Sequence, residues 1–404
     1  MAPAGVVDDD PFVGLRGFCD GVEPPKASEF AERRAALQAT LSAGGYAGLV
    51  LEAGTDLEYL TGLRWGRSER PLLWWLPAQG DARWVGPAFE AGTLEERCAS
   101  VGIGGSDFKL TPWEEDVSPY AVMAELAGTS SVGRVALGPD MRSFILEGLR
   151  AEWRGKKGAR EVEAATELVS DARMVKSPAE LRRLRRANEA TKAALASVSR
   201  LIVPGMTEAD ARPLIRAAQE AAGLQNIWVL ALFGPNAAFP HGTSEPHTLA
   251  DGDLVLVDTG GSLHGYQSDI TRTWGVGRVG DEARKAWDAV LAAQTAALAA
   301  IRPGAKAGEA DALARAELAR RGYDPGYGSM THRLGHGIGL EGHEAPYLRK
   351  DNARALTRGM TMSNEPGIYV RGRFGVRIED IVAVTDAEPE VFGSRPSSLE
   401  SPFE

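Results

Sequence analysis

The stretch HRLGHGIGLEGHE, residues 332–344, contains three of the six histidines of the chain. Residues 337–342 also fit the G-x-G-x-x-G pattern, so this stretch is compatible with a dinucleotide loop, with a metal site, or with neither. A dinucleotide loop needs a strand before it and a helix after it. Residues 330–333 have a poor strand sequence, and Pro346 disfavours a following helix. The dinucleotide interpretation is therefore disfavoured, and the metal interpretation depends on the rest of the chain.

The composition is that of a globular protein with two domains. The chain has 404 residues, 44% of them hydrophobic and 25% charged. Its net charge of −10 argues against strong binding to nucleic acid. No stretch approaches the roughly 18 apolar residues of a membrane helix. The sequence begins without the features of a signal peptide, so we expect a cytoplasmic protein that binds neither nucleic acid nor membrane.

The two cysteines, Cys19 and Cys98, exclude a disulfide framework and a zinc-thiolate site, and they indicate a reducing compartment. We expect residues 1–10 and the region after about 390 to be loose tails.

The N-terminal part has the pattern of a small α/β domain. A helix is predicted near residues 28–41, a buried strand at 47–52, and paired strands at 72–76 and 83–85. Six of the nine tryptophans lie before residue 160, and we expect them to pack in the core: Trp65, Trp74, Trp75, Trp84, Trp113 and Trp153. The charged region 154–176 marks a change of character, which gives domains of 1–165 and 166–404.

The C-terminal part repeats one order of elements. Ser177 and Glu180 form a capping box around Pro178, and Thr207 begins a second helix. The arginine-rich face after Ser177 is predicted to be solvated. Further helices are expected at 281–301 and 307–321, and strands at 227–233, 253–258, 266–274, 360–370 and 375–385. Two helices followed by strands occur twice, which indicates two similar halves.

Four carboxylates and one imidazole stand out in this part. Asp258 ends an apolar strand, and Asp269 follows it by eleven residues across a glycine-containing turn. Glu365 follows another strand, and Glu379 lies in an apolar run. Buried like charges need a cation. Oxygen-rich ligands with one imidazole, His336, suit two divalent ions such as Mn²⁺ or Co²⁺, with Fe²⁺ and Zn²⁺ as alternatives. Two such ions activate a shared water as hydroxide and stabilise an oxyanion.

The order Asp258, Asp269, His336, Glu365, Glu379 resembles the dinuclear site of the pita-bread metallopeptidases, which include Xaa-Pro dipeptidase (prolidase), Xaa-Pro aminopeptidase and methionine aminopeptidase. The resemblance is strong over residues 165–386. It implies an α+β fold with a duplicated pita-bread catalytic domain at 166–404. It also implies a smaller creatinase-type α/β domain at 1–165, which serves substrate access and dimer contacts.

The resemblance also implies the residue roles. Asp258 would hold one ion, Asp269 and Glu379 would bridge two ions, His336 would supply the imidazole between two glycines that leave room for the ions, and Glu365 would be both ligand and general base. The remaining positions would assist. His343 and His241 would contact the substrate, His332 would help proton movement, Arg377 would steady the carboxylates, and Tyr369 would lie in the active site.

The resemblance further narrows the substrate to X-Pro peptides. The N-terminal domain argues against methionine aminopeptidase, and the fourteen-residue step from Glu365 to Glu379 is like that of the short prolidases. Many prolidases place an arginine four residues after the equivalent of His343, to bind the substrate carboxylate. Tyr347 occupies that position here.

We therefore expect one of four other arginines to bind that carboxylate: Arg349, Arg64, Arg67 or Arg70. The predicted function is hydrolysis of X-Pro dipeptides by a manganese homodimer. The alternatives are an Xaa-Pro aminopeptidase acting on longer peptides and an inactive binding protein with the same fold.

Overall fold

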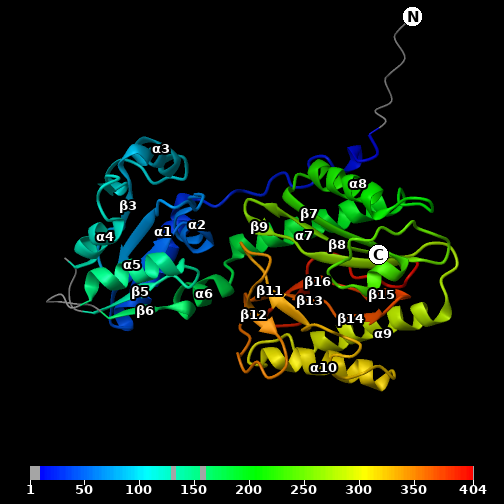
Figure 1. The fold of residues 1–404 in the computed structure, drawn as a ribbon. Coiled ribbons are helices and arrows are strands. Elements are labelled where there is room, and N and C mark those ends of the chain that lie inside the picture. Colours follow the sequence, from blue (N-terminus) through cyan, green and yellow to red (C-terminus); the bar gives the residue numbers. More distant parts are fainter. Residues whose placement is uncertain (1–9, 129–132, 155–160, 404) are drawn as a thin grey trace, which may run out of the picture. The chain divides into compact units, whose positions relative to one another are not determined.

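The computed structural model describes residues 10–128, 133–154 and 161–403. They divide into an N-terminal unit, Pro24–Arg173, and a C-terminal unit, which combines the region from Met174 onwards with the residues before Pro24 (Figure 1). The division lies at the end of helix α6 (Thr166–Met174), whereas the sequence analysis placed the boundary after residue 165. Helix α6 stays with the N-terminal unit because the Arg173 guanidinium lies 2.7 Å from the Asp56 carboxylate.

The N-terminal unit is a mixed six-stranded sheet with helices, as predicted. Its strands have the order β4-β3-β2-β1-β5-β6. The pairs β1–β2 and β2–β3 are antiparallel, and the pairs β3–β4, β1–β5 and β5–β6 are parallel. The strands are β1 (Tyr46–Glu52), β2 (Leu73–Pro77), β3 (Arg83–Pro87), β4 (Leu110–Trp113), β5 (Arg134–Leu137) and β6 (Val162–Ala164). The other helices are α1 (Ala27–Ala43), α2 (Thr55–Thr61), α3 (Ala91–Ser100), α4 (Pro119–Gly128) and α5 (Ser143–Trp153).

Tryptophans fill the core of this unit, as the sequence predicted, except for Trp65, which is half-buried and packs against Arg97. Trp74 of β2 pairs with Trp84 of β3, and their ring centroids lie 6.1 Å apart. Both are 1% exposed, and so is Trp75. Burial of such large rings supplies much of the hydrophobic stabilisation of a small sheet domain.

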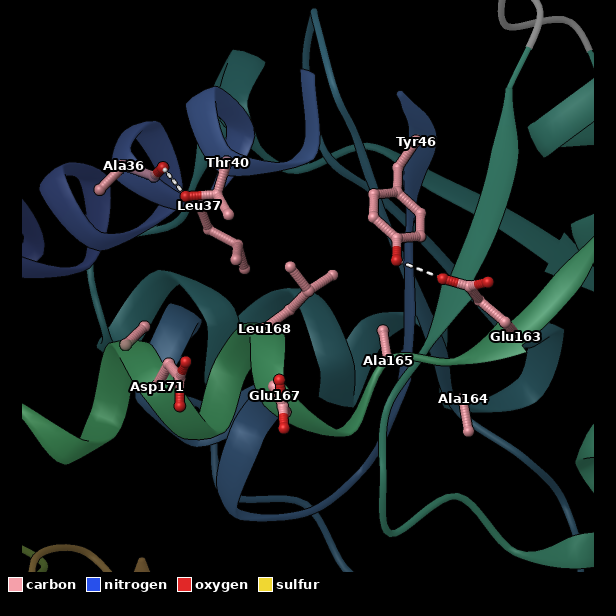
Figure 2. Close-up of a pocket in the computed structure, with 11 residues that line it drawn as sticks. Ala36, Leu37, Thr40, Tyr46, Glu163, Ala164, Ala165, Glu167, Leu168 and Asp171 are labelled. Atoms are coloured by element: carbon pink, nitrogen blue, oxygen red, sulfur yellow. Dashed lines mark hydrogen bonds between the residues drawn. The ribbon is translucent and has the colours of Figure 1, made fainter. Parts of the chain in front are cut away.

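A pocket of about 710 Å³ lies between α1 and α6 in the N-terminal unit (Figure 2). The Tyr46 hydroxyl at its edge donates a hydrogen bond to Glu163. Arg134 donates two more hydrogen bonds to the same carboxylate, at 2.9 and 3.1 Å. Because these hydrogen bonds already pair the Glu163 carboxylate within the unit, it does not need a metal ion as a partner.

The C-terminal unit has the predicted duplicated order. Its first half comprises α7 (Pro178–Ser199), α8 (Glu208–Ala221), β7 (Gln225–Phe233), β8 (Leu254–Leu263), β9 (Tyr266–Gln267) and β10 (Ile270–Gly275). Its second half comprises α9 (Asp281–Leu298), α10 (Ala307–Arg320), β11 (Gly335–Gly337), β12 (Glu344–Leu348), β13 (Thr361–Asn364), β14 (Gly367–Val370), β15 (Phe374–Arg377), β16 (Asp380–Ala383) and β17 (Glu390–Val391). Figure 1 shows α7 and α8 on one face of the strands and α9 and α10 on the opposite face. The site residues lie in the strand layer between these helix pairs.

Both predicted capping boxes are present. At α7, the Glu180 amide donates to the Ser177 hydroxyl, and the Ser177 amide donates to the Glu180 carboxylate. At α8, the Asp210 carboxylate accepts from the Thr207 amide at 2.8 Å. These boxes satisfy amides that have no partner inside the helix, so they fix where each helix begins.

The arginine face of α7 is only partly solvated, contrary to the prediction: Arg182 is exposed, but other arginines of the face bind backbone. Arg183 is 2% exposed and donates to the carbonyl of Glu23, and Arg186 donates to the carbonyl of Phe18. Carbonyls of an irregular segment need donors, and these guanidiniums supply them. The face therefore holds the N-terminal segment against the unit.

The predicted loose end after residue 390 is also wrong. Phe392 is fully buried, and Ser394 accepts hydrogen bonds at its carbonyl from Lys192 and Arg272. The sequence after residue 390 is polar, as in a loose tail, but buried lysine and arginine side chains from elsewhere in the unit bind its backbone carbonyls. Within the predicted N-terminal tail, residues 1–9 lie outside the described residues, and Phe12 is 5% exposed in the core of the C-terminal unit.

Candidate active site

Two aspartates meet on the hairpin of β8 and β10. Asp258 lies in β8 opposite Thr271, and Asp269 lies immediately before β10. Gly260 permits this arrangement, because a Cβ there would lie 1.8 Å from the carbonyl oxygen of Ser268. Asp269 is 6% exposed, so its carboxylate is held out of bulk water.

Two glutamates lie where strands break. Glu365 lies between β13 and β14, and Glu379 lies between β15 and β16. The sequence predicted continuous strands over 360–370 and 375–385, and that prediction was wrong. Pro366 has no amide hydrogen for a continuous ladder, and the amide of Glu379 donates to Thr271 in the neighbouring sheet at 3.0 Å. The breaks turn both carboxylates toward the hairpin.

The histidine stretch supplies the imidazole through a three-residue strand. His336 lies in β11 and is 3% exposed. No helix follows β11, so the dinucleotide interpretation is excluded for this stretch. The flanking glycines were expected to leave room for the ions, but they leave room for neighbouring backbone. A Cβ at Gly335 would lie 2.0 Å from the Ser363 carbonyl oxygen, and a Cβ at Gly337 would lie 2.2 Å from the Ala345 carbonyl oxygen.

The five predicted ligands converge. The His336 Nε2 atom lies 3.1 Å from Glu365 Oε1 and 3.7 Å from Asp269 Oδ2. Three overlapping triplets each have ligand atoms within 4.8 Å of one another: Asp258–Asp269–Glu379, His336–Glu365–Glu379 and Asp269–His336–His343. Asp269, His336 and Glu379 each belong to two triplets, so the cluster is large enough for more than one ion.

The electrostatics of the cluster fit the binding of a cation. Burial raises the pKa of Asp269 well above its usual range, and the charges of Asp258 and Glu365 raise it further. Burial likewise raises the pKa of Glu379, helped by the charge of Asp269. The atoms Asp258 Oδ1 and Glu379 Oε1 are buried and have no hydrogen-bond partner among the described residues. A divalent cation would ionise these acids and satisfy both orphaned oxygens.

Glu365 differs from the other acids. Burial opposes its ionisation, but the hydrogen bond and charge of His336 outweigh burial and lower the pKa of Glu365 to about 2. Its Oε1 atom also accepts a hydrogen bond from the Ser363 hydroxyl at 2.9 Å. Glu365 is therefore the carboxylate of this cluster most readily kept ionised.

Arg377 joins several of the predicted helpers. Its guanidinium lies 2.6 Å from Asp258 Oδ2 and donates to the Tyr369 hydroxyl at 2.9 Å. His332 Nε2 lies 2.7 Å from the same hydroxyl. Burial raises the pKa of Tyr369 to about 12, and burial lowers the pKa of His332. The network therefore keeps Tyr369 protonated and favours neutral His332 beside charged Arg377.

The two predicted substrate histidines lie beside this network. The ring centroid of His343 lies 3.8 Å from that of His336, and burial followed by the charge of His336 lowers the pKa of His343. His241 is exposed, and it follows Pro240, whose carbonyl accepts a hydrogen bond from Arg377 at 3.3 Å. The charge of His241 also contributes to the lowered pKa of His332. Both side chains can therefore face a substrate.

The four candidate arginines are not brought to the cluster by any contact of the described residues. Arg64, Arg67 and Arg70 belong to the N-terminal unit, where they pair with Glu58, Asp140 and Glu115 respectively. Arg349 is an exposed residue after β12. A part for any of them in substrate binding stays a prediction.

Arg333 was missed by the sequence analysis. Its guanidinium lies 4.3 Å from the centre of the Tyr347 ring, and its charge contributes to the lowered pKa of His343. No carboxylate of the described residues forms an ion pair with it. The available signal was Tyr347 at the position of the missing arginine, but sequence alone does not say which cation packs against that ring.

Three supporting residues were also missed. The Thr271 hydroxyl donates to Glu379 at 2.7 Å, the His336 amide donates to Ser363 at 3.0 Å, and the Asp269 amide donates to Asn188 at 3.1 Å. Such partners orient the groups around a metal site. Serine, threonine and asparagine are common in strands and helices, so no sequence signal marked them.

Comparison with known proteins agrees with this geometry. The model of metallopeptidase family M24 matches residues 182–386, and that of the creatinase/prolidase N-terminal domain matches residues 33–175. The chain belongs to metallopeptidase family M24. Its fold is therefore a pita-bread catalytic domain preceded by a creatinase-type domain, as the sequence predicted, and the family implies divalent metal ions.

Several relatives in this family carry dipeptidase names. The chain is 37% identical over 363 residues to a probable dipeptidase PepE of Mycobacterium tuberculosis, covering 89% of this chain and 93% of that protein. The crystal structure of dipeptidase PepE from Mycobacterium ulcerans superposes with a TM-score of 0.84 at 37% identity, covering 93% of this chain and 98% of that one. A prolidase from Thermococcus sibiricus superposes with a TM-score of 0.79 at 27% identity, covering 90% and 97%. In the described part of this M24 chain, no helix combines the length and apolar character needed to cross a membrane.

Proposed function

We propose that this M24 chain is a dinuclear metallopeptidase with Asp258, Asp269, His336, Glu365 and Glu379 as ligands. The observation that carries the proposal is the overlap of the ligand triplets, in which one buried oxygen each of Asp258 and Glu379 has no hydrogen-bond partner among the described residues. The oxygen-rich donor set favours Mn²⁺, with Co²⁺ or Zn²⁺ as alternatives. When bound, two divalent ions activate water and stabilise the charge of a tetrahedral intermediate.

The protein residues around the cluster have distinct roles in this proposal. Glu365 is the general base, as the family resemblance implies, and its carboxylate is kept ionised and so able to accept a proton. His343 and His241 hydrogen-bond the substrate and the developing oxyanion. His332 and Tyr369 pass protons along their 2.7 Å hydrogen bond, and Arg377 holds Asp258 in place.

We further propose that the substrate is an X-Pro dipeptide. Its proline ends in a carboxylate, which needs a cation at a fixed distance from the metals. Arg333 is three residues before His336, packs on Tyr347, and has no carboxylate partner among the described residues. An arginine held against an aromatic ring keeps its donors free for a ligand. We therefore assign Arg333 the role of the arginine that many prolidases have at the position of Tyr347. The dipeptidase names of the relatives agree with this assignment.

The test compares X-Pro with X-Pro amide and X-Pro-Y, using Arg333→Met and Arg349→Met as a matched pair. We expect X-Pro to be cleaved best. Arg333→Met should raise KM for X-Pro on the order of 10²-fold, because a buried charge pair loses one partner. Arg349→Met should change KM for X-Pro little. The second candidate, an Xaa-Pro aminopeptidase, is favoured by the lack of an arginine at 347. Equal cleavage of long and short substrates, unaffected by Arg333→Met, would establish that candidate.

We also propose that the enzyme is a cytoplasmic homodimer. The two cysteines are free and buried, in different units, which suits a reducing compartment. Sedimentation of the purified chain tests the dimer, and a monomer at micromolar concentration would contradict it.

A further inference from the structure

Helix α10 carries a buried ion pair beside the segment that leads to the metal cluster. Asp311 is 1% exposed and Arg315 is 7% exposed, and Arg315 Nε donates to Asp311 Oδ2 at 2.8 Å. The two residues are one helical turn apart, so the pair forms within α10 itself. The function proposed above gives this pair no role.

The pair satisfies the backbone of residues 326–334, which contain neither helix nor strand. Arg315 donates to the carbonyls of Gly326, Met330 and His332, the last at 2.8 Å. Asp311 Oδ1 accepts from the amide of Leu334 at 3.0 Å. Four backbone groups of an irregular segment are thus fixed by two side chains. The Leu334 amide also donates to the Leu348 carbonyl of β12 at 3.0 Å, so the end of the segment is tied to a strand as well, whereas residues 326–333 precede that contact.

This segment carries two residues of the proposed site. His332 bonds the Tyr369 hydroxyl, and Arg333 packs against Tyr347. Leu334 then leads into β11 and His336. A shift of the backbone at 332–334 would therefore move the proposed carboxylate-binding guanidinium.

Stability alone is a weak reason for such a pair. Removing two charges from water is unfavourable, and apolar replacement of a buried pair is often neutral or stabilising. Most of the buried residues around it in α10 are apolar, including Ala310, Ala314 and Leu318. A pair kept in that setting is better explained by the geometry that it imposes.

We propose that Asp311 and Arg315 are positioning residues that fix Arg333 for the carboxylate of the dipeptide. The inference rests on the proposed function, because it assigns Arg315 an effect through Arg333. It predicts that loosening the pair weakens binding of the carboxylate more than it weakens chemistry. Lysine at 315 keeps the charge but cannot reach three carbonyls with a planar fork.

The test measures KM and kcat of Arg315→Met and Arg315→Lys for X-Pro and for X-Pro amide. We expect KM for X-Pro to rise about 10- to 100-fold, as for a displacement near 1 Å, while KM for the amide stays within about twofold. Arg315→Met combined with Arg333→Met should be no worse than Arg333→Met alone, because the effect passes through Arg333. Leu318→Ala is the control: it destabilises the same helix and should lower Tm without changing the preference for X-Pro.

A second measurement does not depend on activity. Hydrogen exchange over residues 326–334 should become faster in Arg315→Met and Asp311→Ala, and exchange in β8 should stay unchanged. Unchanged exchange over residues 326–334, equal rises of KM for X-Pro and its amide, or full additivity with Arg333→Met would each overturn the inference. Failure of the proposed function would give a different result. The wild-type enzyme would then show no preference for X-Pro over X-Pro amide, and Arg333→Met would not change KM for X-Pro.

Discussion

The two halves of the C-terminal unit share an order of elements but supply different chemistry. The first half contributes Asp258 from within β8 and Asp269 from the break between β9 and β10, where the predicted strand 266–274 is interrupted. The second half contributes His336, Glu365 and Glu379 from a three-residue strand and two strand breaks. Duplication thus provides the scaffold, and in both halves some ligands lie where strands break, but the second half adds the imidazole that the first half does not supply.

The halves also hold their substrate-facing segments differently. In the first half, Glu208 at the start of α8 accepts from the amides of Phe233 and His247 and from the Asn236 side chain, so it holds the loop that carries His241. In the second half, the Asp311–Arg315 pair holds the segment that carries His332. One half therefore uses a single carboxylate where the other uses an ion pair. The carboxylate can only accept hydrogen bonds, here from amides, whereas the arginine of the pair also donates to carbonyls.

The largest effect should come from removing one of the proposed bridging ligands, Asp269 or Glu379. Asp269→Asn and Glu379→Gln should each bind fewer ions and lose activity on the order of 10³-fold, because metal ions supply several kcal/mol of transition-state stabilisation. Elemental analysis and X-Pro hydrolysis measure the two effects, with the exposed Asp288→Asn as control. Chelation should abolish hydrolysis, and Mn²⁺ or Co²⁺ should restore it. Full activity in exhaustively chelated enzyme, or two retained ions in either variant, would contradict the ligand assignment.

The next effect compares the two substrate histidines. His343→Ala should lower kcat about 10²- to 10³-fold with metal content near normal, as for loss of an oxyanion partner. His241→Ala should have a smaller effect, because the His343 ring centroid lies 3.8 Å from that of His336, whereas His241 is linked to the site through the neighbouring Pro240 carbonyl, which accepts from Arg377. Loss of metal in His343→Ala would instead place His343 among the ligands.

The ligand set could be predicted from sequence because each acid adjoins a recognisable strand end or turn. The strand breaks could not, since the apolar runs on both sides of Glu365 and Glu379 resemble single strands. Arg333 could not either, because its contact with Tyr347 depends on the irregular pairing of β11 with β12. The packed C-terminal end was missed because Lys192 and Arg272, which bind its backbone, lie far away in the sequence.

A smaller effect separates the two ways of holding a segment. Glu208→Gln replaces one acceptor oxygen by a donor and should lower kcat about tenfold, through the loop of His241. It should leave the preference of X-Pro over X-Pro amide unchanged, whereas Arg315→Met should reduce that preference. Steady-state kinetics of both variants with X-Pro and X-Pro amide measures this preference. If Glu208→Gln reduced the preference as much as Arg315→Met does, the two halves would not divide the work in this way.

The smallest effect concerns Asp380, which is contacted by both halves. Lys192 of α7 and Arg272 of β10 form ion pairs with it, whereas Gln294 of α9 donates a neutral hydrogen bond at 2.9 Å. Burial lowers the pKa of Lys192 to about 8, although the charge of Asp380 opposes the shift. The contribution of the first half to this contact therefore depends on pH, and that of the second half does not.

The sign of this dependence follows from linkage. An unfolded lysine has a pKa near 10.4, so between about pH 8 and 10.4 the unfolded chain binds more protons at this residue than the folded chain. The free energy of unfolding then rises with pH through this window, by at most about 1.4 kcal/mol per pH unit from this group. Urea unfolding of wild type and Lys192→Met measures the difference. The rise should be lost in Lys192→Met and kept in Gln294→Met. The same slope in wild type and Lys192→Met would show that Lys192 keeps an ordinary pKa, and that the two halves contact Asp380 with the same pH dependence.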